Sequence, residues 1–174
     1  GMAPNTTEQE WMNLAGKNDR LRNGMGRLYQ LFQKAPVLGS LISPRTGEAD
    51  LLVAAFNELQ PLLEKALAQG VKDDTVHEMA VTARGVTKAA DILSGQFTLV
   101  ATNVPYLGIR KQCTTLKEFA TTYFPDAKEC LSTVFCTRIL DWLDETTMAI
   151  VTPQNWFYQF RYRNHRTNVL KNNS

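Results

Sequence analysis

Apolar residues along the first half of the chain recur with the period of an α-helix. The first such segment runs from residue 7 to about 34. It predicts one long helix or two short ones, since three glycines within it lower the helix propensity. Residues 35–50 hold two prolines and two glycines, which predicts a connector with little regular structure. Apolar stripes over residues 52–67 and 76–93 predict further helices, with Pro61 kinking or dividing the first.

The second half has a different pattern. Residues 97–101 form an almost continuous apolar run before a polar break with proline, which predicts a short buried strand ending in a loop. Residues 116–124 predict a short helix, and Asp126 with Glu129 resembles a capping box that opens the next helix. Residues 147–151 predict a second strand, which a helical crossover would make parallel to the first.

These elements predict a helix-rich α/β protein. An N-terminal helical layer is followed by a strand–helix–helix–strand–helix portion of an incomplete, Rossmann-like sheet. We expect two domains, a helical region over residues 2–95 and a partial sheet domain over residues 96–174. The leucine stripes of the first region are expected to form its core.

Composition is that of an ordinary globular protein. The 174 residues are 44% apolar and 21% charged, and a net charge of +2 indicates no particular partner. No apolar run is long enough to span a membrane, and no signal peptide opens the chain, so we expect a cytoplasmic protein. Gly1 resembles a scar of tag removal; Met2 as a native start would make the chain a separate short gene product.

Cysteine usage excludes two classes of stabilising site. Cys113, Cys130 and Cys136 are odd in number, lack paired ligand spacing and have only two histidines to assist them. We therefore expect no disulfide framework and no metal site. Buried free thiols are the predicted state of all three.

The loop after the first predicted strand carries the main candidate chemistry. It reads Asn103-Val104-Pro105-Tyr106. The asparagine amide can accept a hydrogen bond from an exocyclic amino group, and proline stiffens the loop. The tyrosine ring offers a flat face on which a base can stack. Such a loop suits a nucleobase amino group, and in open α/β sheets the chemistry lies beyond the carboxyl ends of strands.

This loop and its surroundings resemble the amino-group DNA methyltransferases that modify adenine, especially the large restriction-type and phage-defence enzymes of the PglX kind. Their usual loop is Asn-Pro-Pro-Tyr, so Val104 replaces the first proline here. The resemblance extends from about residue 89 to 157. Its landmarks occur in the same order: Ile92–Phe97, Asn103–Gly108, Leu116–Phe119, Tyr123–Asp126 and Ile150–Phe157.

The resemblance implies a mechanism for the loop. The target adenine would be flipped out of the duplex, because its amino group is inaccessible inside the base stack. Asn103 and the backbone carbonyl in the Val104–Pro105 segment would accept hydrogen bonds from that amino group, and Tyr106 would stack on the base. The methyl donor of the complete enzyme would be S-adenosylmethionine, and DNA would be the substrate.

The same resemblance predicts an incomplete enzyme. No glycine-rich turn follows a predicted strand, and Gly24-Met25-Gly26 lies inside a helical pattern. The residues that bind the cofactor are therefore unknown, and we expect none to be bound by this chain alone. The chain would be an inactive fragment, either cut from a longer enzyme or encoded as a truncated or split frame, and would reach DNA through the full-length enzyme or a complementing chain.

The C-terminal stretch is both aromatic and basic, and no acidic residue follows Glu145. Trp156, Arg161, Arg163 and Arg166 are candidate contacts to DNA, because phosphates attract arginines and bases stack on aromatic rings. An equally simple interpretation is a helix whose aromatic residues pack on the sheet while its arginines meet water.

Two other classes of function stay open. In a non-catalytic interaction module, Asn103 would only cap the turn, Tyr106 would fill a gap, and the open sheet would pair with a partner chain or a second copy. A nuclease is less well supported. The sequence offers no convincing Pro-Asp…Asp/Glu-x-Lys cluster for metal-dependent cleavage.

Overall fold

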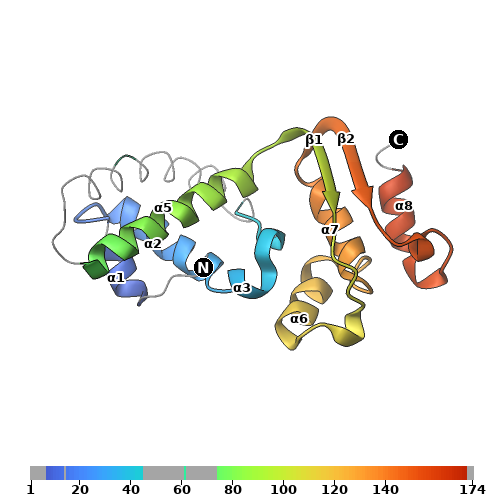
Figure 1. Ribbon diagram of the computed structural model, residues 1–174, viewed down its shortest axis with the longest axis horizontal. Helices are drawn as coiled ribbons and strands as arrows, with labels where there is room; N and C mark the ends of the chain where they lie inside the picture. The colour runs from blue at the N-terminus through green and yellow to red at the C-terminus, as the bar shows by residue number, and fades with distance from the viewer. Residues whose placement is uncertain (1–6, 14, 45–60, 62–73, 172–174) are drawn as a thin grey trace. The chain divides into compact units, whose positions relative to one another are not determined.

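The computed structural model describes residues 7–13, 15–44, 61 and 74–171. The protein is a helix-rich α/β chain with a small sheet, and it divides between Gly95 and Gln96 into two compact units. The first unit is helical where it is described, and the second contains both described strands (Figure 1).

The first predicted helix is two helices, α1 (Glu8–Asn13) and α2 (Asp19–Phe32). They are separated at Gly16, whose φ of 62° is a conformation that glycine adopts without strain. The side chain of Asn18 caps α2 by accepting a hydrogen bond from the Leu21 amide at 3.2 Å. The apolar side chains of this pair form the core of the unit: Trp11, Leu21, Met25, Leu28 and Phe32 are buried.

The connector predicted from residue 35 onward is more regular than expected. It forms the short helix α3 (Ala35–Leu38) and a 3-10 turn, η1 (Gly39–Leu41). Pro36 lies in the first turn of α3, where a missing amide hydrogen costs nothing. The stripe predicted over residues 52–67 lies outside the described residues except for Pro61, which is helical. The next stripe is confirmed as α5 (Asp74–Ser94).

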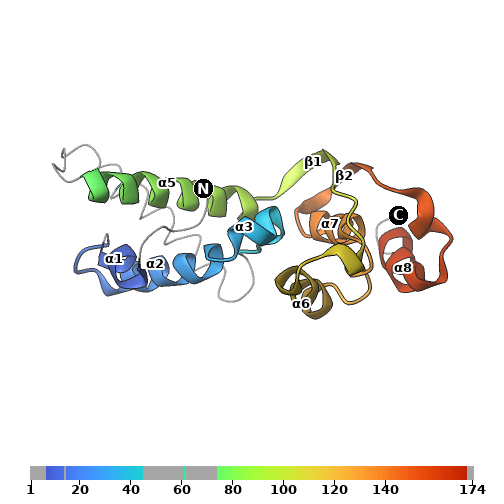
Figure 2. The same cartoon turned by 60° about the horizontal axis from the view of Figure 1, so that its bottom comes forward.

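The second unit follows the predicted order of strand, two helices, strand and helix, with short 3-10 turns between them. β1 and β2 lie side by side, and α7 lies against them (Figure 1 and Figure 2). Its elements are β1 (Phe97–Asn103), η2 (Ile109–Lys111), α6 (Thr114–Tyr123), α7 (Leu131–Leu140), β2 (Leu143–Val151), η3 (Gln154–Phe157), η4 (Phe160–Tyr162) and α8 (Arg163–Lys171).

The two strands pair in parallel, as predicted. The register joins Leu99 to Thr147 and Asn103 to Val151, so both strands end at the same edge of the sheet. On one face, Met148 and Ile150 pack against a buried cluster. Its members come from the turn before α7, α7 itself, η3, η4 and α8: Cys130, Cys136, Trp156, Tyr162 and Val169.

The expectation that β1 is buried is wrong for this chain. Leu99 is 57% exposed and Val151 is 58% exposed, and they share the sheet face opposite Met148 and Ile150. Side chains alternate between the faces of a strand, so a sheet with helices on one face leaves every second residue in water. A continuous apolar run indicates that both faces of a strand are suited to burial. Only the tertiary structure shows which face packs against helices.

The predicted capping box does not form. The helix α7 begins at Leu131, after Cys130, and no side chain caps it. The carboxylate of Asp126 instead accepts hydrogen bonds from the side-chain amides of Asn164 at 3.2 Å and Asn168 at 3.3 Å. Asp126 therefore binds side chains of α8, which are distant in sequence, in place of the predicted local contact at the start of α7.

The thiols divide into two classes. Cys130 and Cys136 are buried as predicted, and burial raises the pKa of Cys136 to about 11. The prediction was wrong for Cys113, which is exposed at the N-cap position of α6. Within the described residues, none of the helices combines the length and the apolar composition that a membrane span requires.

Candidate functional site

The candidate loop begins where the two strands end together. Asn103 is the last residue of β1, is exposed, and pairs in register with Val151, the last residue of β2. The chain therefore leaves the sheet at neighbouring points after both strands. This carboxyl edge is where parallel α/β sheets present their reactive side chains.

Within the loop, one residue points inward and its neighbours point outward. Val104 is buried, whereas Pro105 is exposed and Tyr106 is 52% exposed. The hydroxyl of Tyr106 donates a hydrogen bond to Oδ1 of Asn103 at 3.1 Å. The two side chains that the sequence singled out therefore touch each other on the surface, and the Val104 side chain anchors the loop between them.

The exit of the loop is fixed by backbone and side-chain hydrogen bonds. The carbonyl oxygen of Leu107 accepts from the Leu131 amide at 2.9 Å and from Nε2 of Gln112 at 3.0 Å. Gly108 forms an antiparallel bridge with Cys130. A loop held at a strand end on one side and by these bonds on the other keeps its exposed groups in place without a bound ligand.

The chemistry available to this loop is recognition of a flat group with an amino edge. The amide oxygen of Asn103 has two acceptor positions, and the Tyr106 hydroxyl uses one of them. The Tyr106 ring has a half-exposed aromatic surface. No described group of three or more His, Cys, Asp or Glu side chains gathers in a way that could hold a metal ion.

Two of the four predicted DNA contacts are part of the fold. The Trp156 ring is buried, lies edge-on to His165 at 5.1 Å between centroids, and stacks on Phe157 at 4.1 Å. Nη1 of Arg166 donates hydrogen bonds to the carbonyl oxygens of Trp156 at 2.7 Å and Gln159 at 2.8 Å. These contacts hold the turns between β2 and α8 together.

The other two predicted contacts are exposed. Nε of Arg161 donates a hydrogen bond to Gln159 at 2.9 Å, its guanidinium lies over the Tyr162 ring, and its Nη1 is 3.9 Å from a Glu129 carboxylate oxygen. Arg163 begins α8 on the surface. The sequence marked this stretch as aromatic and basic, but an irregular segment has no periodicity to show which rings are outside.

His165 is a buried titratable group beside this surface. Its Nδ1 lies 3.3 Å from Oγ1 of Thr137. Burial is the main reason that the pKa of His165 falls from 6.5 to about 4; Arg166 lowers it further, and Asp126 partly opposes both. The histidine is therefore neutral at pH 7 and serves packing.

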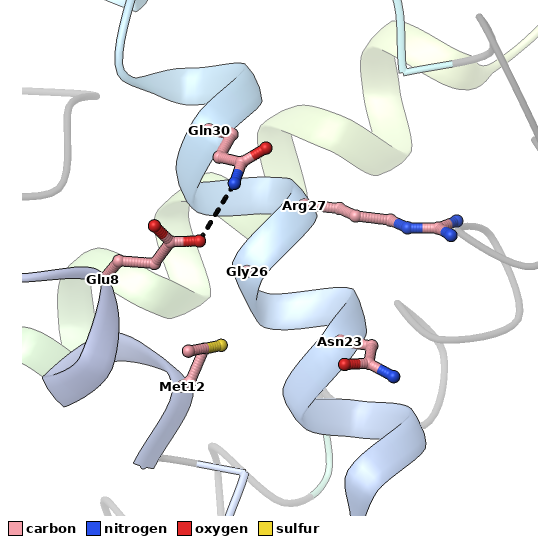
Figure 3. Close-up of a pocket in the computed structure, with 6 residues that line it drawn as sticks. All are labelled: Glu8, Met12, Asn23, Gly26, Arg27 and Gln30. Atoms are coloured by element: carbon pink, nitrogen blue, oxygen red, sulfur yellow. Dashed lines mark hydrogen bonds between the residues drawn. The ribbon is translucent and has the colours of Figure 1, made fainter.

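A separate hollow of about 290 Å³ lies on the first unit between α1 and α2 (Figure 3). Gln30 donates a hydrogen bond to Glu8 across it at 3.1 Å. A Cβ at Gly26 would lie 3.2 Å from Sδ of Met12, so this glycine allows the two helices to approach closely. Gly24 and Gly26 lie inside α2, as their helical pattern predicted, and the close approach at Gly26 is a contact between two helices.

The described residues do not fit a nucleoside cofactor that needs a glycine-rich turn after a strand. Asn103-Val104-Pro105 follows β1, and Thr152-Pro153 follows β2. Neither turn offers the run of unencumbered backbone amides that such cofactors use.

Comparison with known proteins identifies the family to which this chain belongs. The sequence model of the Eco57I restriction-modification methylase matches residues 45–174, which is most of the chain. The chain belongs to this family. The resemblance that its landmarks indicated is therefore confirmed.

Two curated relatives are each similar to part of this chain. The chain is 32% identical over 149 residues to the adenine-specific methyltransferase BrxX of Escherichia coli O9:H4 (strain HS), covering 84% of this chain and 12% of that protein. It is 33% identical over 76 residues to the adenine-specific methyltransferase PglX of Lacticaseibacillus casei (strain Zhang), covering 43% of this chain and 6% of that protein. The chain thus spans about an eighth of the length of the first of these relatives.

Proposed function

We propose that this chain is the target-base portion of a site-specific DNA adenine-N6 methyltransferase of a restriction-modification or phage-defence system. One observation carries the proposal. Asn103 and Tyr106 lie together, exposed and hydrogen-bonded, on a fixed loop at the carboxyl edge of a parallel sheet. Membership of the Eco57I methylase family and the names of the two relatives support it.

In the proposed mechanism the enzyme acts on an adenine that has left the duplex. The amide oxygen of Asn103 and the backbone carbonyl in the Val104–Pro105 segment accept hydrogen bonds from the exocyclic amino group, which raises electron density on its nitrogen. Pro105 stiffens the loop, and the Tyr106 ring stacks on the base. The loop contributes positioning and local electrostatics, and no covalent intermediate with the protein is required.

The bare sheet face supports the proposal that this is a piece of a larger catalytic domain. Parallel sheets are almost always covered on both faces, yet Leu99 and Val151 lie on an uncovered one. We propose that residues 96–174 are part of a Rossmann-like catalytic core, and that residues 2–95 are a separate helical region. The S-adenosylmethionine site would then lie in other parts of the enzyme, and this chain alone would not methylate DNA.

We assign contacts with the DNA backbone to the exposed basic side chains at the C-terminal end of the chain, Arg161 and Arg163. Arg161 and Arg163 would approach phosphates, while Trp156 and Arg166 would act by holding that surface in shape. Such contacts are sequence-independent and weaken as salt rises.

The test compares unpaired adenine with unpaired purine, which lacks the amino group, at one position of a labelled oligonucleotide. The wild-type chain should bind the adenine version more tightly, and Asn103→Ala should remove that preference. Tyr123→Ala, an exposed tyrosine change on α6, should leave it intact. Equal binding of both bases by the wild-type chain contradicts the proposal.

A second measurement tests the proposal that the cofactor site lies outside this chain. Calorimetric titration of the chain with S-adenosylmethionine should give no binding heat. Tight binding would show that the chain contains its own cofactor site, and it would refute the claim that the site lies elsewhere.

The bare sheet face also favours a second candidate, a non-catalytic module that pairs with a partner chain or a second copy. Leu99 and Val151 would lie at that contact. Where the partner is a second copy of the chain, sedimentation velocity distinguishes the two proposals, because it shows whether the chain forms a dimer. A dimer that Leu99→Lys dissociates, together with no preference for adenine, would favour the interaction module.

A further inference from the structure

We propose that Phe160 and Tyr158 form a stacking platform for unpaired bases of DNA, on the segment that leaves the sheet at the same edge as the target-base loop. This inference rests on the proposed function, because it takes DNA to be the partner. It goes further in naming the side chains that contact bases away from the target site.

Among the described aromatic side chains, these two rings are the most exposed. Phe160 is 82% exposed and Tyr158 is 66% exposed, against 52% for Phe157, whereas Trp156 and Tyr162, in the same segment, are buried. An aromatic ring held in water forgoes the stabilisation that its burial would give. Two such rings within three residues are a feature of binding surfaces, where aromatic residues are enriched.

The backbone that presents the rings is held from both sides. Arg166 bonds the carbonyl oxygens of Trp156 and Gln159, which flank Tyr158. The buried rings of Trp156 and Tyr162 anchor the turns η3 and η4 in the cluster under the sheet. A platform fixed in this way loses little conformational entropy when it binds.

The positive charge around the two rings favours nucleic acid as the partner, because phosphates attract basic side chains. The segment after Glu145 has no acidic residue, and Arg161 and Arg163 lie on the surface beside Phe160 in sequence. Glu129 approaches Arg161 at 3.9 Å and offsets part of its charge, whereas Asp126 is engaged by two amides of α8. Exposed rings interleaved with arginines match the bases and phosphates of a single strand.

The position of the segment links it to the target-base loop. Asn103 and Val151 pair in register at the ends of parallel strands, so the chain enters both the loop and the segment that leads to Phe160 from the same sheet edge. When a base is extruded from a DNA strand, each neighbouring base loses one stacking contact, which an exposed aromatic ring can replace.

The experiment measures binding of the full 174-residue chain to two labelled single strands of about a dozen nucleotides. One carries bases, and the other has the same phosphates but abasic sugars. Phe160→Ala should weaken binding of the first about fivefold or more and leave binding of the second unchanged. Tyr158→Ala should have the same selective effect. Tyr123→Ala, which removes a ring of similar exposure on α6, should alter neither.

Arg163→Ala provides the complementary control, because it should weaken binding of both strands and reduce the salt dependence. The platform is refuted if the wild-type chain does not prefer the strand with bases, or if Phe160→Ala weakens both strands equally or neither. Self-association that depends on Phe160, without binding of either strand, would also refute it and identify a second copy as the partner. The adenine preference, which Asn103→Ala should remove, is measured separately. That result tests the proposed target-base loop, whereas the Phe160 and Tyr158 variants test the platform.

Discussion

The hydroxyl of Tyr106 donates a hydrogen bond to Oδ1 of Asn103 at 3.1 Å, on the surface of the loop that follows β1. The bond directs the amide so that its oxygen faces the tyrosine side of the loop. In the proposed mechanism the ring stacks on the target base, whereas the hydroxyl positions the amide of Asn103. The ring and the hydroxyl of Tyr106 would then have different roles.

Tyr106→Phe separates these roles. Because both partners are exposed, the free energy of unfolding should change by less than about 0.5 kcal/mol. The side-chain amide signals of Asn103 should shift in the NMR spectrum, since the amide loses its partner, whereas Tyr123→Phe should leave them in place. Unchanged Asn103 signals in Tyr106→Phe would show that the hydrogen bond is not populated in solution.

Val104 replaces a proline of the usual motif, and burial gives it a structural role. Val104→Ala should lower the free energy of unfolding by roughly 1–2 kcal/mol, because a buried side chain loses two methyl groups. Urea denaturation measures the change. The same substitution at exposed Val151, at the end of the neighbouring strand, should cost less, and equal losses would mean that Val104 does not anchor the loop.

His165 should make the second unit sensitive to acid. Its pKa is about 4 when folded and near 6.5 when unfolded, so between these values the unfolded chain binds a proton that the folded chain does not. Stability should therefore fall as pH drops from 6.5 to 4. Thermal unfolding midpoints should depend less on pH over this range in His165→Gln than in the wild-type chain. An identical slope in His165→Gln would assign the acid sensitivity to other groups.

Arg166 and Arg163 should differ in what they support. Arg166→Ala removes hydrogen bonds from a charged donor to two carbonyl oxygens and should lower the free energy of unfolding by roughly 2–3 kcal/mol. Arg163→Ala should stay within about 0.5 kcal/mol, because its side chain is exposed. Chemical denaturation of both variants tests the difference. Comparable stabilities would mean that Arg166 does not hold the turns.

Local pattern was sufficient for α5 of the first unit and for most elements of the second unit. The helical period over residues 76–93 and the apolar run from Phe97 depend on neighbours in sequence, and both elements occur where they were predicted. A strand–helix–strand order also predicts parallel pairing, because a crossover returns the chain in the same direction. The order of the landmarks in the sequence alone indicates the family to which the chain belongs.

What the sequence by itself determined was therefore the identity of the elements, the family, and the position of Asn103 and Tyr106 after the end of a strand. The tertiary structure alone decided which face of the sheet is bare, which aromatic rings are anchors and which are exposed, and that Asp126 binds α8 amides instead of capping α7. The reason is physical. Periodicity reports contacts between residues a few positions apart, whereas burial and hydrogen-bond partners in irregular segments depend on residues brought together from distant parts of the chain.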